Sequence, residues 1–226
     1  MRNYYQPNSF SQTAFPISKA GYPFIFALAF ITIVFAILGT IFISFIFLFL
    51  TLFTCFFFRD PDRLVPISPS AIVSPADGKI IDISIVNNCP CLTGKYRKIS
   101  IFMSIFNVHV NRAPFEGTVK QIDYYPGKYF SANLDKASKN NERNAILVQT
   151  KTGINICFVQ IAGLVARRII CSIQPGNLLK KGQRIGLICF GSRLDLYIPL
   201  DVNLNVVKGN VVRAGSSIIG ELSNVG

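Results

Sequence analysis

The feature that most constrains this chain is a run of 39 residues, 20–58, that contains no Asp, Glu, Lys, Arg or His. About 20 apolar residues suffice to cross a bilayer, so the run is long enough for two helices joined by a turn at Gly39. Lys19 precedes the run and Arg59 follows it, so a hairpin puts both cations on one side, which is the cytoplasmic side by the positive-inside tendency. We expect a transmembrane helical hairpin after a cytoplasmic tail of residues 1–19; one long tilted helix is the alternative.

The rest of the chain, residues 59–226, has the size of one folded domain. Without Arg2 and Lys19 it keeps 21 of the 23 Lys and Arg residues and all 11 Asp and Glu residues, so its net charge is +10. This excess favours an anionic membrane surface as a partner. It does not favour nucleic acid, because the basic residues form no concentrated block.

The six cysteines are expected to be reduced thiols on the cytoplasmic side. Cys89 and Cys91 are spaced like half of a zinc site, but the chain has no second such pair and a single histidine. No metal site is therefore expected. Three further cysteines lie in apolar runs and are expected in the core: Cys157, Cys171 and Cys189.

Past residue 59 the pattern of apolar residues is that of strands rather than helices. Short runs rich in Ile and Val alternate with turns that contain Gly, Pro, Asn or Asp. The expected fold is mainly β, a compact antiparallel barrel or sandwich with hammerhead-like features in the segment 174–186, and with a short helix near 163–168. The expected strands are Lys79–Val86, Lys98–Phe106, Gly117–Tyr124, Ala145–Gln149, Ile154–Ile161, Arg184–Cys189 and Leu194–Pro199.

Three polar segments stand out from this pattern. Asp77 lies in Ser-Pro-Ala-Asp-Gly, which has the composition of a turn. His109 is the only histidine and suits proton transfer near neutral pH; alternation is expected to put it on one strand face with Asn107 and Asn111. The third segment, 213–218, has the loop-like sequence Arg-Ala-Gly-Ser-Ser-Ile. Each of the three is also compatible with a purely structural role.

Together with their neighbours, these segments resemble phosphatidylserine decarboxylases in their short, membrane-anchored bacterial and archaeal form. The resemblance runs in order from residue 56 to residue 221, and the apolar segment before it is also typical of that form. The segments that carry it are FFFRDPDR (56–63), SPADGKI (74–80), SIFNVHVNRAP (104–114), YYPGKYF (124–130), LDKASKNNERNA (134–145) and RAGSS (213–217).

In this family the protein cuts itself at a Gly–Ser bond near its C-terminus, and the serine becomes a pyruvoyl group, the covalent cofactor. The resemblance implies that this bond is Gly215–Ser216. The products would be a β chain, 1–215, and an α chain, 216–226, which stay together as a heterodimer. The implied reaction is decarboxylation of phosphatidylserine to phosphatidylethanolamine through a Schiff base with the pyruvoyl group.

The resemblance also implies a triad of Asp77, His109 and Ser216. In it, Asp77 orients the imidazole and His109 moves the proton of the serine hydroxyl. His109 is also the expected proton donor to the decarboxylated substrate, and Arg112 and Arg143 are candidates for binding its phosphate or carboxylate. The implied partners are phosphatidylserine in the inner cell membrane, with the domain on the cytoplasmic face, and in some members a second copy of the chain.

The sequence departs from the longer bacterial members of that family at two places. They have Leu-Gly-Ser-Thr where this chain has Ala-Gly-Ser-Ser (214–217), so a second hydroxyl follows the expected nucleophile. They also have a further histidine near the position of Asn107, and its function is not carried over to this chain.

Three other functions stay open at this point. A membrane-tethered hammerhead carrier would use Asp-Lys-Ala (135–137) as a lipoylation turn, although a long polar segment follows Lys136. A different pyruvoyl decarboxylase would act on a soluble amino acid or on S-adenosylmethionine. A lipid-binding homologue would keep the fold and never be cut.

Overall fold

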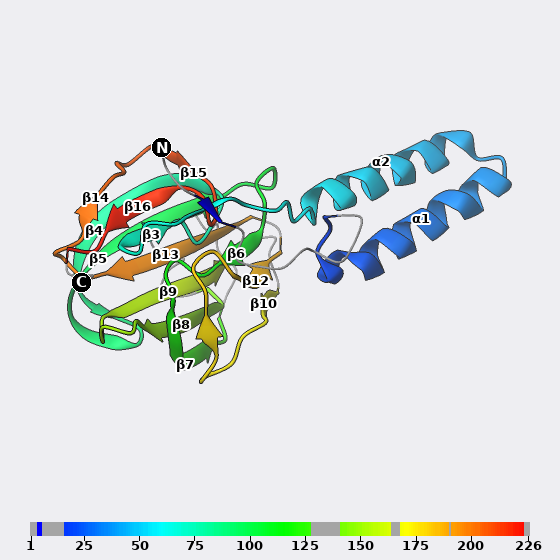
Figure 1. The fold of residues 1–226 in the computed structure, drawn as a ribbon. Helices are drawn as coiled ribbons and strands as arrows, with labels where there is room; N and C mark the ends of the chain where they lie inside the picture. Colours follow the sequence, from blue (N-terminus) through cyan, green and yellow to red (C-terminus); the bar gives the residue numbers. More distant parts are fainter. Residues whose placement is uncertain (1–3, 6–15, 128–140, 164–167, 190, 224–226) are drawn as a thin grey trace. The chain divides into compact units, whose positions relative to one another are not determined.

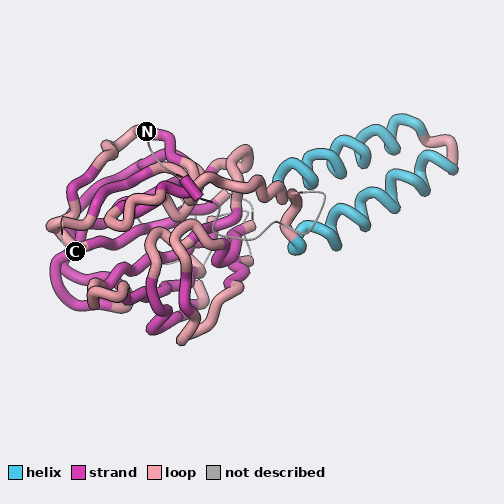
Figure 2. Tube along the Cα trace, in the orientation of Figure 1, coloured by secondary structure: helices cyan, strands magenta, loops and turns pink. Residues whose placement is uncertain are grey.

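The computed structural model describes residues 4–5, 16–127, 141–163, 168–189 and 191–223. Contacts divide the chain into two compact units: residues 10–62, and residues 63–226 together with residues 1–9. The first unit consists of helices and the second of strands (Figures 1 and 2). Each is described by itself.

The helical unit is a pair of antiparallel helices, α1 (Tyr22–Ile37) and α2 (Ile41–Phe57). Gly39 has a φ of +72° in the turn between them, a left-handed conformation that glycine adopts at little cost. The rings of Phe35 and Phe47 stack with their centroids 5.7 Å apart. The two helices therefore pack against each other through their apolar side chains.

Large apolar side chains of this pair are exposed all around, with Ile37 and Phe42 about as exposed as side chains can be. A helix that is apolar on every face needs an apolar surrounding. A 3-10 turn, η1 (Lys19–Gly21), extends α1, and the segment Lys19–Ile37 is long and apolar enough to cross a membrane by length and composition. Helix α2 is apolar but shorter. The helical unit thus has the properties of a membrane anchor.

The second unit contains short and long strands. They are β1 (Tyr4–Tyr5), β2 (Val65–Pro66), β3 (Ala71–Val73), β4 (Gly78–Cys89), β5 (Leu92–Met103), β6 (Val110–Arg112), β7 (Gly117–Tyr125), β8 (Arg143–Gln149), β9 (Asn155–Ala162), β10 (Ile169–Cys171), β11 (Leu178–Leu179), β12 (Arg184–Ile188), β13 (Ser192–Ile198), β14 (Asn203–Leu204), β15 (Val211–Val212) and β16 (Ile218–Glu221).

Half of these strands belong to one curled antiparallel sheet, in the order β11-β7-β8-β9-β13-β5-β4-β15 (Figure 1). Two three-stranded sheets, β10-β12-β6 and β14-β16-β3, and the pair β1-β2 complete the unit. The prediction of a mainly β, antiparallel fold is confirmed.

Strand β13 illustrates why this sequence forms such a sheet. Leu194 and Leu196 point into the main apolar core, and the alternate residues Arg193 and Asp195 point to the opposite face. The buried Arg193 guanidinium donates to Asp195 Oδ1 at 2.6 Å and to Ser100 Oγ at 2.8 Å. The charged side chains are therefore paired where the curled sheet removes them from water.

All seven predicted strands have counterparts, and β4 and β5 are longer than predicted at their shared turn. The prediction that the strand starting at Lys98 continues to Phe106 is wrong, because β5 ends at Met103 and a turn follows. The shortest strands were not predicted, since two or three residues carry no periodicity. Residues 164–167 of the predicted helix lie outside the described residues. Cys157 and Cys189 are buried as expected, and Cys171 packs half-buried against the core.

The register of the large sheet brings three loops to one end of it. Met103, the last residue of β5, pairs with Ser192, the first residue of β13. Lys79, near the start of β4, pairs with Phe102. The loop before β4, the loop after β5 and the loop before β13 therefore meet at this end, and they contain Asp77, His109 and Gly191.

Candidate active site

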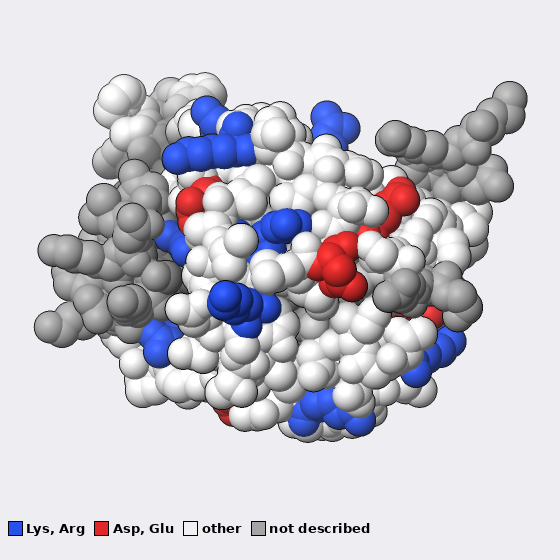
Figure 3. Space-filling model, turned by 90° about the vertical axis from the view of Figure 1, so that its left-hand side faces the viewer, with Lys and Arg blue, Asp and Glu red and all other residues white. Residues whose placement is uncertain are grey.

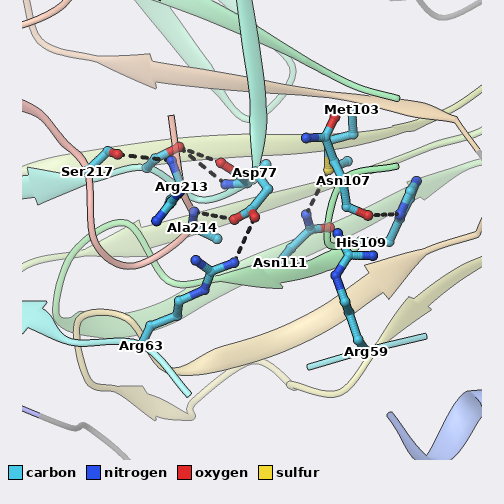
Figure 4. A network of polar contacts seen from close by, with 12 residues as sticks. Arg59, Arg63, Asp77, Met103, Asn107, His109, Asn111, Arg213, Ala214 and Ser217 are labelled. Atoms are coloured by element: carbon cyan, nitrogen blue, oxygen red, sulfur yellow. Dashed lines mark hydrogen bonds and ion pairs between the residues drawn. The ribbon is translucent and has the colours of Figure 1, made fainter. Parts of the chain in front are cut away.

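The loop with the expected cleavage bond connects β15 to β16 and forms a tight turn. The N–H groups of Ser216 and Ser217 donate to Arg213 O at 3.2 and 3.0 Å, and Arg213 N–H donates to Ser217 Oγ at 2.9 Å. Gly215 N–H donates to Ser74 O, and Ser74 N–H donates to Ser217 O, each at 2.8 Å. The loop 213–217, called the cleavage loop below, is thus bound to the segment before β4, which also carries Asp77 (Figure 4).

Gly215 has a φ of +74°, in the left-handed region that side chains with a Cβ rarely adopt. A Cβ placed there would lie 3.0 Å from Arg112 Cδ and 3.8 Å from Arg63 Cβ. Two arginine side chains therefore border Gly215. Their guanidinium groups bond to Asp77 Oδ2 and to Gly182 O, so the loop lies in positively charged surroundings.

Replacing Gly215 by alanine is expected to slow self-cleavage about 5- to 30-fold. The reason is that a left-handed alanine costs about 1–2 kcal/mol, and its Cβ also presses on Arg112. The fraction of cut chain, followed over time on a denaturing gel, measures this. Gly153→Ala is the matched control, because Gly153 has a φ of +83° with nothing near its Cβ position. Equal cleavage rates in the two variants would contradict the prediction.

Asp77 is buried and holds the cleavage loop directly. Its Oδ1 accepts the N–H of Ala214 at 2.7 Å, and its Oδ2 accepts from the guanidinium of Arg63 at 2.7 Å. The sequence predicted this carboxylate beside the imidazole of His109. Among the described residues it is bonded instead to Arg63 and to the residue that precedes Gly215 (Figure 4).

His109 is buried just after the turn that follows β5. Its Nδ1 lies 2.9 Å from Asn107 O, and because a carbonyl only accepts, Nδ1 carries the proton. The N–H of Gly191 points to Nε2 at 3.4 Å. A neutral imidazole with its proton on Nδ1 fits both of these contacts.

The predicted strand face of Asn107, His109 and Asn111 is wrong. The side chain of Asn107 accepts from Ser104 N–H at 2.9 Å and from Ser104 Oγ at 2.8 Å. An asparagine that bonds to nearby backbone competes with strand pairing and favours a turn. Only Asn111 lies in a strand, β6.

Strand β6 leads from His109 to the cleavage loop. Arg112, its last residue, donates its N–H to Pro75 O at 2.9 Å and borders Gly215. His109 precedes Arg112 by three residues, which is roughly 10 Å along an extended chain. The structure therefore brings Asp77 to the cleavage loop and leaves His109 one short strand away from it.

A chain of buried amide side chains next to His109 was not predicted. Asn144 donates to Gln160 Oε1 at 3.1 Å, and Gln160 donates to Asn111 Oδ1 at 2.9 Å. Asn111 in turn lies 3.6 Å from Met103 Sδ. Buried networks of hydrogen bonds fix side-chain positions. This amide chain, from Asn144 through Gln160 to Asn111, therefore holds β6, the strand that follows His109, in place.

The two candidate substrate-binding arginines differ in position. Arg112 is buried at the cleavage loop and donates to Gly182 O at 3.1 Å. The neighbouring Lys181 is also buried, and loss of hydration lowers its pKa, opposed by the nearby Glu116 carboxylate. Arg143 instead lies on β8 with its guanidinium 4.5 Å from the centre of the Tyr125 ring. Neighbouring residues of a strand point to opposite faces, so Arg143 points away from the face on which Asn144 bonds to Gln160.

The geometry can be compared with known proteins. The family model of phosphatidylserine decarboxylase matches residues 50–220, which is most of the chain. The chain belongs to the phosphatidylserine decarboxylase family. It is 49% identical to the phosphatidylserine decarboxylase proenzyme of Desulfotalea psychrophila over 211 residues, which cover 93% of this chain and 99% of that protein. The proenzyme of Syntrophus aciditrophicus is 48% identical over 205 residues, 90% of this chain and 96% of that protein.

Membership in the phosphatidylserine decarboxylase family makes the chain an enzyme rather than a hammerhead carrier. Lys136, the residue that a lipoyl carrier would use, lies outside the described residues. The names of the relatives call them proenzymes, which means precursors that are processed. Sequence analysis alone missed Arg63 as a site residue, although it lies in one of the segments that carry the resemblance.

Proposed function

We propose that this chain cuts itself between Gly215 and Ser216 and then decarboxylates phosphatidylserine to phosphatidylethanolamine at a membrane surface. The observation that carries the proposal is the cleavage loop itself. Its glycine is left-handed, its preceding N–H is bound by the buried carboxylate of Asp77, and its nucleophile is half-buried. A surface turn that only connects two strands does not need this combination of features.

The cleavage begins when Ser216 Oγ attacks the carbonyl carbon of Gly215. The hydroxyl proton passes to a base, the C–N bond breaks, and the amine of Ser216 takes up a proton, so an ester replaces the amide. Removal of the α-proton of Ser216 then expels the Gly215 carboxylate and leaves dehydroalanine at position 216. Its imine tautomer adds water and loses ammonia, which leaves a pyruvoyl group.

The surroundings of the loop support this chemistry. The charges of Arg63 and Arg112 next to Gly215 stabilise the oxyanion of the attack and the carboxylate of the product. Asp77 holds the N–H of Ala214, and the N–H of Ser216, which shares a peptide plane with the Gly215 carbonyl, donates to Arg213 O. The absence of a Cβ at Gly215 leaves room for the tetrahedral carbon.

The α chain stays in place after the cut. Residues 218–221 form β16, which pairs with β3 on one side and with β14 on the other. Upstream of the cut, β15 pairs with β4. Both new chain ends are therefore held by separate strands, and the cut product is a heterodimer of chains 1–215 and 216–226.

The residues at position 216 and around it fit a pyruvoyl group, because a small planar group replaces a half-buried serine. This group would supply a ketone carbonyl that binds the amine of the substrate and delocalises the electron pair that stays behind when CO2 leaves. His109 holds a proton at Nδ1 against Asn107 O and presents Nε2 for proton transfer. Arg112 is the cation closest to the cleavage point that can bind the substrate carboxylate or phosphate.

The membrane location follows from the substrate. A diacyl lipid stays in the bilayer, and the apolar helices α1 and α2 supply an anchor for the enzyme. By the positive-inside tendency, the cations that flank the helices support a catalytic domain on the cytoplasmic face of the cell membrane.

The test is release of labelled CO2 from phosphatidylserine labelled at its serine carboxyl carbon, with the full chain in lipid vesicles. One CO2 is expected for each phosphatidylethanolamine formed. Prior treatment with borohydride is expected to abolish the reaction, because it reduces a ketone. A purified, cut enzyme that releases no CO2 from this lipid would contradict the proposed activity.

A further inference from the structure

We propose that the turn between β5 and β6 inserts Ile105 and Phe106 into the lipid surface that carries the substrate, an inference that rests on the proposed function. Ile105 is 39% and Phe106 64% exposed, and they are adjacent at the tip of this turn. The turn of residues 104–107, which carries these two side chains, is called the apolar tip below.

The apolar tip is a rigid structure. Asn107 N–H donates to Ser104 O at 3.0 Å, and Asn107 Oδ1 accepts from both the N–H and the hydroxyl of Ser104. These three bonds close the turn across its two apolar residues. The backbone of the turn is thus already ordered, and only the two side chains lose freedom when they enter lipid.

The apolar tip is also connected to His109. The carbonyl of Asn107 binds the imidazole Nδ1 at 2.9 Å. Phe106 precedes His109 by three residues, so the two are at most about 10 Å apart along the chain. The headgroup layer of a bilayer is about 5–8 Å deep on each side. With Phe106 at the boundary of the acyl chains, His109 lies at the depth of the headgroups, where the serine carboxylate is.

Lipid is the occupant that these features favour over a protein. A stable protein interface buries about 800 Å² on each partner, far more than two side chains supply. The exposed Arg168 lies near His109. The N–H of Cys189 donates to Arg168 O, and the N–H of the preceding residue, Ile188, donates to His109 O. An apolar tip next to a cation suits an anionic lipid surface.

Charge does not identify a docking face on the side of the molecule that Figure 3 shows. On the described part of the face in Figure 3, separate groups of Lys and Arg alternate with acidic side chains. No continuous basic patch covers that part. The position of the apolar tip, rather than the charge of this face, therefore indicates how the domain is oriented on the lipid surface.

The chain contains no tryptophan, so Phe106→Trp introduces a single fluorophore. The matched control is Ile85→Trp, because Ile85 is 62% exposed and pairs with Arg97, at the end of β5 away from Met103. The full chain is placed in vesicles of phosphatidylserine and phosphatidylcholine with brominated acyl chains. We expect the tryptophan at 106 to emit at shorter wavelength and to be quenched strongly, and the one at 85 to be quenched weakly. Equal quenching at the two positions would overturn the proposal.

A second experiment separates membrane docking from chemistry. Phe106→Ser is expected to lower kcat/KM about tenfold or more on bilayer phosphatidylserine, because one buried aromatic side chain is lost from the lipid contact. It is expected to leave kcat/KM on a short-chain, monomeric phosphatidylserine within about twofold of the native value, with self-cleavage complete as the check of folding. Ile85→Ser is the control. An equal loss on both substrates, or no loss on the bilayer, would overturn the proposal, whereas a native enzyme without activity would contradict only the proposed function.

Discussion

Ser216→Ala is expected to leave the chain as a single polypeptide of 25.1 kDa without decarboxylase activity. The methyl group of alanine can neither attack the Gly215 carbonyl nor become a pyruvoyl group. The native chain is expected to yield a fragment of about 24 kDa and another of about 1 kDa, from ordinary residue masses. Intact mass and CO2 release from phosphatidylserine measure the two effects.

Ser217→Ala is the matched control for this substitution, because the two serines are adjacent. Ser217 Oγ accepts from Arg213 N–H and so supports the turn. Removing this acceptor is expected to slow cleavage by a modest factor and to leave the products unchanged. If the Ser216→Ala chain were still cut, or if the Ser217→Ala chain were never cut, Ser216 would not be the nucleophile.

His109→Ala is expected to lower the rates of both self-cleavage and decarboxylation by about 10²- to 10⁴-fold, the usual contribution of a general acid–base group. His109 is the only histidine of the chain, and its ring is fixed between Asn107 O and Gly191 N–H. The two rates are measured separately, as the fraction of cut chain over time and as CO2 released per cut enzyme.

His109→Gln serves as the control for packing. Glutamine keeps hydrogen-bonding groups in the buried space but does not titrate near neutral pH. It is expected to preserve the melting temperature better than alanine and to be equally slow in both reactions. If either variant kept both rates within about threefold of the native values, proton transfer by His109 would be ruled out.

The loops of the candidate site were predictable from sequence because their signals are local. The Asp-Gly pair at the start of β4 and the Gly-Ser-Ser segment before β16 are turn formers. The second forms a turn in the structure, whereas Asp77 lies in a bend and Gly78 is already the first residue of β4. The ranges of the core strands followed from their runs of apolar residues, and in β13 Leu194 and Leu196 face the core as alternation requires.

The missed features depend on contacts between residues that are far apart in sequence, or on a local competition. The amide chain joins Asn111 to Gln160 across 49 residues, and only the pairing of strands determines that they meet. Arg63 and Asp77 are 14 residues apart and lie outside the strands, so no local pattern predicts their contact. At Asn107 two local signals compete, and the side-chain bond to Ser104 prevails over strand alternation. Sequence also gave no means of placing His109 relative to the cleavage loop.

The most direct measurement is the mass of the C-terminal fragment, isolated from the native protein without any reducing agent. A fragment that begins with a pyruvoyl group at position 216 is about 17 Da lighter than the same peptide with an N-terminal serine, and it reacts with hydroxylamine. We predict that lighter mass. An uncut chain, or a fragment with a free serine amine, would contradict self-conversion of Ser216, on which the proposed function depends.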